Sequence, residues 1–356
     1  MPSNLTRTTF TLLMALLAAA ACVQLGTPLP WMIGPLLATA VLSMLGAPTH
    51  SHMPLRNAGQ WVIGAAMGLY FTPQVVALVL SLWWVIALNV LWALALGVAF
   101  GAWLYWVHHG PGSFHIAGLS RSTTYCASPI GGAAEMTLMA ERRSGQVDLV
   151  ASSHSLRVLL VTLIIPFGFQ FAGLHGTDTT LPGPRIVNGP GLAALGALTG
   201  IGCWVMLKLE RTNPWFLGPL AASLLLTASG HSWSAIPAWM SNAAQLVIGI
   251  SLGVRFTRDF VHTAPRWLAS VALGTLAMMV LCAGYAWLLA WATDLRWATV
   301  LLGTAPGGIA EMGITAKVLQ LGVPLVTALH VTRLAAVLLL VEPMYRWIYD
   351  DQAKNA

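Results

Sequence analysis

A pattern of glycines, glutamates, histidines and arginines occurs twice in this chain, and it contains the residues whose types and spacing could do chemistry. It covers residues 129–157 and returns over residues 305–333, with equivalent positions 176 residues apart. The matched pairs are Gly131 and Gly307, Gly132 and Gly308, Glu135 and Glu311, His154 and His330, and Arg157 and Arg333. Because most of the remaining chain is apolar, these are the polar groups that a function has to use.

Each glycine pair predicts an interrupted helix, over residues 129–132 in the first half and 306–308 in the second. Glycine lets the backbone turn sharply and approach a solute closely. The half-helix that begins after each pair has free N–H groups and a positive dipole end, which suit an anion or a substrate carboxylate. Helices interrupted at matching positions of two repeats indicate a secondary transporter with its binding site near the interruptions.

Glu135 and Glu311 are the acidic residues that we expect deepest in the fold. A carboxylate in hydrocarbon is costly unless it is paired, hydrated or protonated, and intramembrane acids commonly mark ion or proton paths. One interpretation is that one or both glutamates bind a coupling H⁺ or Na⁺. The other is that each glutamate sits in the first turn of its half-helix and only neutralises the helix dipole.

His154 and Arg157 are three residues apart and therefore share one face of a helix, as do His330 and Arg333. A buried arginine needs a partner, and we expect one of the two glutamates to be that partner. The histidines and arginines could bind a substrate anion or relay a proton. Alternatively, they form a fixed structural link that holds the broken segment to the last helix of each half.

The composition places these groups in a membrane. Hydrophobic residues make up 57% of the chain, charged residues 8%, and the mean hydropathy is +0.75. Apolar runs of about twenty residues recur without the alternation of a barrel strand, which predicts spanning helices. The first run follows Arg7 and resembles a signal peptide, but its counterpart in the second half cannot be cleaved as one, so we expect it to be retained.

The helices that must position the pattern follow from these runs. A short segment over residues 57–71 contains Gly59, Gly64 and Gly68, which suits close helix packing better than lipid exposure. Between residues 108 and 145 lie two apolar pieces, each too short to span a membrane. The longer helices expected in the first half cover residues 8–26, 30–46, 75–107 and 147–172.

The chain also contains an internal duplication outside the polar pattern. Residues 214–220 repeat the Pro-Trp-x-x-Gly-Pro-Leu of residues 30–36, and residues 242–249 repeat the Asn-Ala-x-Gln-x-Val-Ile-Gly of residues 57–64. A repeat of this length decides the architecture. We predict a first repeat over residues 1–175, a linker over residues 176–190 and a second repeat over residues 191–356.

The basic residues predict the direction of the repeat. If each broken pair is re-entrant, each half crosses the membrane five times, and twelve Lys and Arg face one side against three on the other. If each pair spans, the repeat is parallel and the numbers become seven and eight. The positive-inside rule favours the first arrangement. The predicted fold is therefore an all-α polytopic membrane protein of two inverted repeats, with about ten spanning helices, two re-entrant or broken helix pairs and cytoplasmic termini.

Other polar groups give weaker signals. Ser120 and residues 122–125 precede the first break and could line a solute path or only satisfy helix ends. Five histidines in two loops lack neighbouring carboxylates and have no counterpart in the second half, so we predict no metal site. They are His50, His52, His108, His109 and His115. No P-loop, dinucleotide fingerprint or catalytic motif occurs, so we predict no cofactor and no catalytic residue.

The doubled Pro-Trp-x-x-Gly-Pro-Leu and Gly-Gly-x-Ala-Glu-Met segments resemble the AbrB-type bacterial membrane family, in which the same unit is duplicated, over about residues 10–350. Members of that family carry two labels, ammonia monooxygenase and regulator of gene expression. A monooxygenase needs a redox metal or flavin site, and the loop histidines are the only weak candidates. A DNA-reading regulator needs a basic recognition element, whereas the segments outside the membrane are short loops.

We therefore expect a secondary transporter of a small, anionic solute, coupled to H⁺ or Na⁺ by alternating access. The alternatives are a membrane oxidoreductase similar to ammonia monooxygenase and a membrane sensor or regulator of gene expression. The expected partners are the lipid bilayer and a small-molecule or ion substrate, without nucleic acid, and a homo-oligomer is left open. The expected location is the bacterial inner membrane.

Overall fold

The computed structural model describes residues 4–109, 116, 118–174, 176, 186–258 and 264–350. Over this part of the chain the secondary structure consists of fifteen α-helices and a π-helical turn, without strands. The predicted all-α class is therefore confirmed. The chain divides into two compact units, each assembled from both halves of the sequence. Unit 1 comprises residues 1–81, 163–262 and 310–324, and unit 2 comprises residues 82–162, 263–309 and 325–356.

Six helices in the described chain are long and apolar enough to cross a membrane. They are α1 (Asn4–Gln24), α5 (Trp83–His109), α8 (Val147–Phe171), α9 (Gly189–Lys208), α13 (Pro265–Thr293) and α16 (Val323–Tyr345). A helix satisfies its own backbone hydrogen bonds, and about 20 residues cover the hydrocarbon thickness of a bilayer. Together with the composition, these helices give the chain the character of a membrane protein.

Unit 1 contains α1, α9, the end of α8 and several shorter helices. The shorter helices are α2 (Pro30–Met44), α3 (Met53–Gly68), α4 (Pro73–Ser81), α10 (Pro214–Ala228), α11 (Ala238–Gly253) and α15 (Ile309–Val318). Helices α2 and α10 start in the same way, because Leu29 and Asn213 adopt left-handed backbone conformations and a proline follows each. Proline is well suited to the first helical position, where its missing N–H breaks no helical bond.

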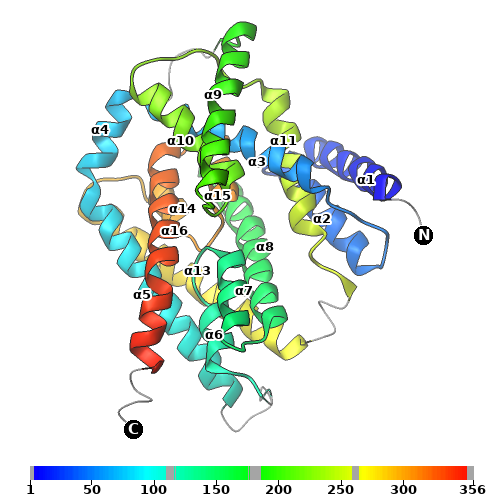
Figure 1. Ribbon diagram of the computed structural model, residues 1–356, viewed down its shortest axis with the longest axis vertical. Helices are drawn as coiled ribbons and strands as arrows, with labels where there is room; N and C mark the ends of the chain where they lie inside the picture. Colours follow the sequence, from blue (N-terminus) through cyan, green and yellow to red (C-terminus); the bar gives the residue numbers. More distant parts are fainter. Residues whose placement is uncertain are drawn as a thin grey trace. The chain divides into compact units, whose positions relative to one another are not determined.

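Close helix crossings hold unit 1 together. Helix α2 packs along α11 (Figure 1), and α3 packs along α10. A Cβ on Gly64 of α3 would collide with the carbonyl oxygen of Phe216, and a Cβ on Gly249 of α11 would collide with that of Met32. Small residues let helix backbones approach this closely. The prediction that the glycines of residues 57–71 serve helix packing is therefore confirmed.

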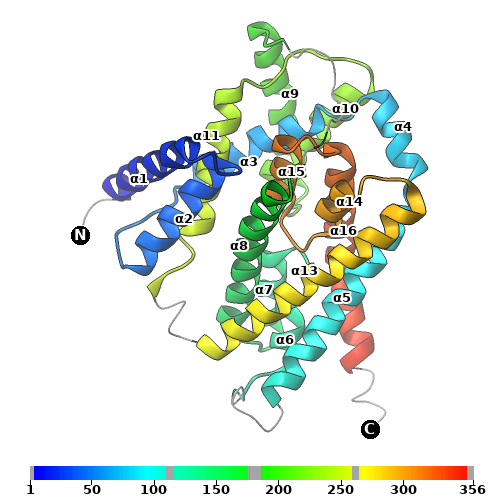
Figure 2. The same ribbon diagram turned by 180° about the vertical axis from the view of Figure 1, so that it is seen from behind.

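Unit 2 combines α5, α13, the beginning of α8 and most of α16 with three short helices. These are α6 (Arg121–Ala127), α7 (Ala133–Arg142) and α14 (Trp297–Thr304), and the π-helical turn η1 (Arg346–Asp350) follows α16. Apolar side chains from α5, α6, α7, α8, α13 and α16 form its main core. The fully buried Trp267 of α13 donates a hydrogen bond of 3.0 Å to the carbonyl oxygen of Leu149 in α8. Figure 2 shows α6 and α7 beside α8.

One predicted helix is wrong in its extent. The helix expected over residues 75–107 consists of α4 and α5, separated at Leu82, where the chain passes from unit 1 to unit 2. In addition, α3 and α4 meet at an angle of 85°. Pro73 starts α4 and cannot continue the hydrogen bonding of α3, which accounts for that second break.

Candidate functional site

The first helix break lies between α6 and α7, as the glycine pair predicts. Gly131 and Gly132 adopt φ values of +123° and +63°, which L side chains rarely take. Glycine is therefore required where the chain turns into α7. A Cβ on Gly132 would also lie 3.2 Å from Cδ2 of Leu338 in α16, so the glycine gives this helix room.

Two side chains of α8 bind the carbonyl oxygens at the end of α6. Arg157 donates to the carbonyl oxygen of Ser128 at 2.9 Å and to that of Pro129 at 2.6 Å. His154 Nε2 lies 2.9 Å from the carbonyl oxygen of Cys126, and His154 Nδ1 lies 2.7 Å from Arg157 Nη2. A carbonyl can only accept and a guanidinium can only donate, so this geometry requires a neutral histidine that is protonated at Nε2.

The second break repeats this arrangement with residues from α14 and α16. Arg333 donates to the carbonyl oxygen of Ala305 at 2.7 Å and to that of Gly307 at 2.8 Å. His330 Nε2 lies 2.8 Å from the carbonyl oxygen of Leu302, and His330 Nδ1 lies 2.8 Å from Arg333 Nη2. The His-x-x-Arg motif of each half therefore does the same structural task.

This task is the capping of a helix C-terminus inside the fold. The last carbonyl groups of a helix have no partner within it, and that end of the helix carries a partial negative charge. A buried guanidinium satisfies two such groups and balances the charge. We expected Glu135 or Glu311 as the partner of the arginines, but over the described residues neither glutamate forms an ion pair with Arg157 or Arg333.

Each break therefore holds a buried arginine that forms no ion pair over the described residues. Arg157 and Arg333, which both belong to unit 2, are each 2% exposed. Arg333 Nε is buried and has no hydrogen-bond partner in the described part of the chain. Carbonyl dipoles compensate a buried charge less completely than a carboxylate does.

The two glutamates occupy the same helical position but different surroundings. Each is the third residue of its half-helix, Glu135 in α7 and Glu311 in α15. Glu311 is 8% exposed, and within unit 1 Arg255 and Arg56 act on it electrostatically. Glu135 belongs to unit 2 and is partly exposed. Both interpretations of the glutamates remain predictions, since a first-turn carboxylate also favours the helix dipole.

The hydroxyl groups before the first break satisfy helix ends. Ser120 Oγ accepts a hydrogen bond from the Thr123 amide at 3.2 Å, and Thr123 Oγ1 accepts one from the Gln146 amide at 2.8 Å. Ser122 Oγ donates to the carbonyl oxygen of Arg143 at 3.1 Å. These bonds agree with the interpretation that Ser120 and residues 122–125 satisfy helix ends, and they do not require that the residues line a solute path.

Two further polar side chains, Asn89 and Tyr125, also attach to α16. Asn89, the seventh residue of α5, is 1% exposed and donates to the carbonyl oxygen of Leu329 at 3.3 Å. The hydroxyl of Tyr125 donates to the carbonyl oxygen of Val341 at 2.9 Å. Asn89 was not singled out from the sequence, although a lone amide in an apolar helix was a usable signal.

The histidines predicted in two loops have separate surroundings, and the prediction is wrong for His108 and His109, which form the last turn of α5. His50 Nδ1 lies 2.9 Å from Thr8 Oγ1, whereas the buried His108 ring lies 5.3 Å from that of Trp267. His115 lies outside the described residues. Over those residues, no group of three or more His, Cys, Asp and Glu side chains is placed to hold a metal ion.

Comparisons with known proteins agree over nearly the whole chain. A family model described as "Transition state regulatory protein AbrB" matches residues 31–349. The chain is 26% identical over 351 residues to the Escherichia coli (strain K12) protein named "Putative regulator AbrB", covering 96% of this chain and 97% of that protein. It is 24% identical over 360 residues to "Uncharacterized protein YhjN" of Bacillus subtilis (strain 168), covering 91% and 88%. No solved structure matches.

Proposed function

We propose that this chain, which belongs to the AbrB family, is a secondary transporter that moves a small anionic solute together with H⁺ or Na⁺. The observation that carries the proposal is the pair of helix breaks, each capped by a buried His-x-x-Arg motif and followed by a glutamate. Breaks at matched positions of a helical membrane protein are the feature from which carriers build their binding sites.

Charge at the breaks supports an anionic solute. Arg157 and Arg333 are buried and bind carbonyl oxygens and histidines, and Arg333 Nε is without a partner among the described residues. A solute carboxylate would complete the charge balance that the carbonyl dipoles leave unfinished. Glycine at positions 131, 132, 307 and 308 would let the solute approach the backbone closely.

The proposed architecture is the inverted repeat, with ten spanning helices, both termini in the cytoplasm and a place in the bacterial inner membrane. The distribution of basic residues supports this orientation;. In this scheme Glu311 is the first candidate for binding the coupling ion, which its burial supports, and Glu135 is the second;.

The test is uptake into proteoliposomes that contain the purified full-length protein. A mixed panel of small organic acids, amines and amino acids is offered under an imposed H⁺ or Na⁺ gradient, with wild type, Glu135→Gln and Glu311→Gln compared at equal reconstitution. Uptake of an acid that requires the gradient and is lost in Glu311→Gln is the expected result, because an amide cannot carry the proton or bind Na⁺ as a carboxylate does.

The same preparation separates the alternatives. The name of the Escherichia coli relative favours a regulator, and a regulator without flux would retain a cytoplasmic partner during purification. A membrane oxidoreductase would contain copper or iron that is lost on replacing His108 and His109. Absence of uptake for every solute, with both glutamine variants folded and identical to wild type, would reject the transporter.

A further inference from the structure

Unit 1 contains a second candidate site that the helix breaks do not explain. It is an open cavity of about 900 Å³, lined by three segments of the chain: residues 69–74, 186–188 and 227–235. Cavities of roughly 300–1,000 Å³ are typical of small-molecule sites. Both glutamates and both arginines of the duplicated pattern are absent from its lining.

Hydrogen bonds fix the walls of this cavity. The Asn188 amide donates to Ser234 Oγ at 3.0 Å, and the Ala235 amide donates to the carbonyl oxygen of Ile186 at 3.1 Å. A Cβ on Gly191 would collide with the carbonyl oxygen of Trp233, so the start of α9 is packed directly against the segment that carries this tryptophan. Two chain segments are therefore joined before any ligand binds, and a preformed site loses less free energy on binding.

The lining supplies many side chains that can form hydrogen bonds. Gln74, Asn188, Ser232 and His231 are exposed in the cavity, and Trp233 is 39% exposed. Asn188 stands before the first residue of α9 but its side chain makes no capping hydrogen bond, so its carboxamide is available to a ligand;. None of the described lining residues is Asp, Glu, Lys or Arg.

This chemistry selects the class of ligand. An anion or a cation would find no Asp, Glu, Lys or Arg partner among the described lining residues, and an unpaired charge that loses water is unfavourable;. Amide and hydroxyl side chains both donate and accept hydrogen bonds, which matches a solute rich in hydroxyl groups. An indole offers an apolar face with one polar N–H, suited to the C–H face of a sugar ring.

We propose that this cavity binds an uncharged carbohydrate of one or two rings, with Trp233 against a ring face and Asn188 and Gln74 on its hydroxyl groups. The site is separate from the helix breaks and goes beyond the transport of an anion. Equilibrium binding requires neither a gradient nor flux, so its result is independent of the uptake experiment.

The test is calorimetric titration of the full-length protein in lipid nanodiscs, so that no sugar-headed detergent competes. Glucose and maltose are compared with glucuronate and glucosamine, which carry a negative and a positive charge on a similar ring. We expect saturable binding of glucose or maltose, at least tenfold weaker binding of both charged sugars, and at least a tenfold loss of affinity in Trp233→Leu.

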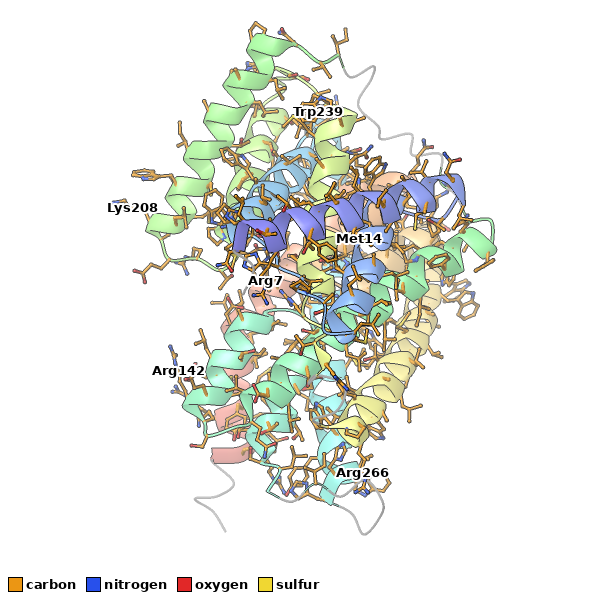
Figure 3. All side chains as sticks on the ribbon, turned by 90° about the vertical axis from the view of Figure 1, so that its right-hand side faces the viewer. Arg7, Met14, Arg142, Lys208, Trp239 and Arg266 are labelled. Carbon is orange, nitrogen blue, oxygen red and sulfur yellow. The ribbon has the colours of Figure 1, made fainter. Side chains whose placement is uncertain are left out.

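Trp239→Leu is the matched control, because Trp239 is 70% exposed on α11 (Figure 3) and does not line the cavity. It should bind as wild type does. Asn188→Ala provides a second, smaller change if Trp233→Leu elutes as aggregate, and it should weaken binding several-fold. Binding of neither uncharged sugar, tighter binding of a charged one, or unchanged affinity in the folded Trp233→Leu or Asn188→Ala protein would overturn the proposal.

Discussion

The guanidinium of Arg157 donates a hydrogen bond of 2.6 Å to the carbonyl oxygen of Pro129. Arg333 makes the equivalent bond of 2.7 Å to Ala305, 176 residues later. The second hydrogen bond differs between the two arginines. Arg157 donates it to the carbonyl oxygen of Ser128, one residue before Pro129. Arg333 donates it to the carbonyl oxygen of Gly307, two residues after Ala305. The two breaks are thus capped by the same chemistry in different registers.

Replacing Arg157 by Met should destabilise the protein strongly. The variant leaves two buried carbonyl groups without donors, and each costs about 1–3 kcal/mol, so we expect a loss of roughly 2–6 kcal/mol. Melting followed by size-exclusion chromatography of the detergent-solubilised protein measures it. Arg142→Met is the control, since Arg142 is exposed at the end of α7 (Figure 3). Equal melting temperatures of Arg157→Met and wild type would show that the capping bonds contribute nothing.

Replacing Gly132 by Ala should also lower the melting temperature. Gly132 has φ +63° and ψ +39°, and a Cβ in this left-handed conformation costs about 1–2 kcal/mol;. Gly168→Ala in α8 provides the comparison, because a Cβ there meets nothing within 4 Å and alanine favours a helix;. If both alanine variants melt alike, the turn at Gly132 does not require glycine.

Replacing Gly64 by Leu should separate α3 from α10. The new side chain would begin against the backbone of Phe216, where helix atoms cannot move away independently;. We expect a reduced yield of monodisperse protein, measured by fluorescence-detected chromatography. Gly196→Leu in α9 has open space at its Cβ and should retain the wild-type yield. A normal yield of Gly64→Leu would contradict the close crossing.

Features that depend on local residue types could be predicted from the sequence. Proline and glycine interrupt the apolar runs at residues 129–132 and 306–308, and the structure breaks α6 from α7 and α14 from α15 there. The crowding of Gly59 and Gly64 against neighbouring helices follows from the same kind of signal;. Proline and glycine change the backbone at their own positions, so their effect can be predicted from the sequence alone.

Features that depend on backbone partners could not be predicted. Residue types show that a buried Arg157 needs a partner, but any residue offers a carbonyl oxygen, so Ser128 and Pro129 give no signal 28 or 29 positions away. The separation of α4 from α5 at Leu82 could not be predicted either, because the apolar run continues through this position without a proline or glycine. The cavity beside Trp233 combines three distant segments that no single motif marks.

The most direct test of coupled transport is the initial rate of acid uptake by wild-type proteoliposomes before and after an ionophore collapses the imposed gradient. We predict gradient-dependent uptake that falls to the level of protein-free liposomes once the H⁺ or Na⁺ gradient is removed, and equally low uptake in Glu311→Gln with the gradient intact. Uptake that never exceeds the protein-free level for any solute on the panel, in a protein that is folded and correctly inserted, would contradict the proposed function.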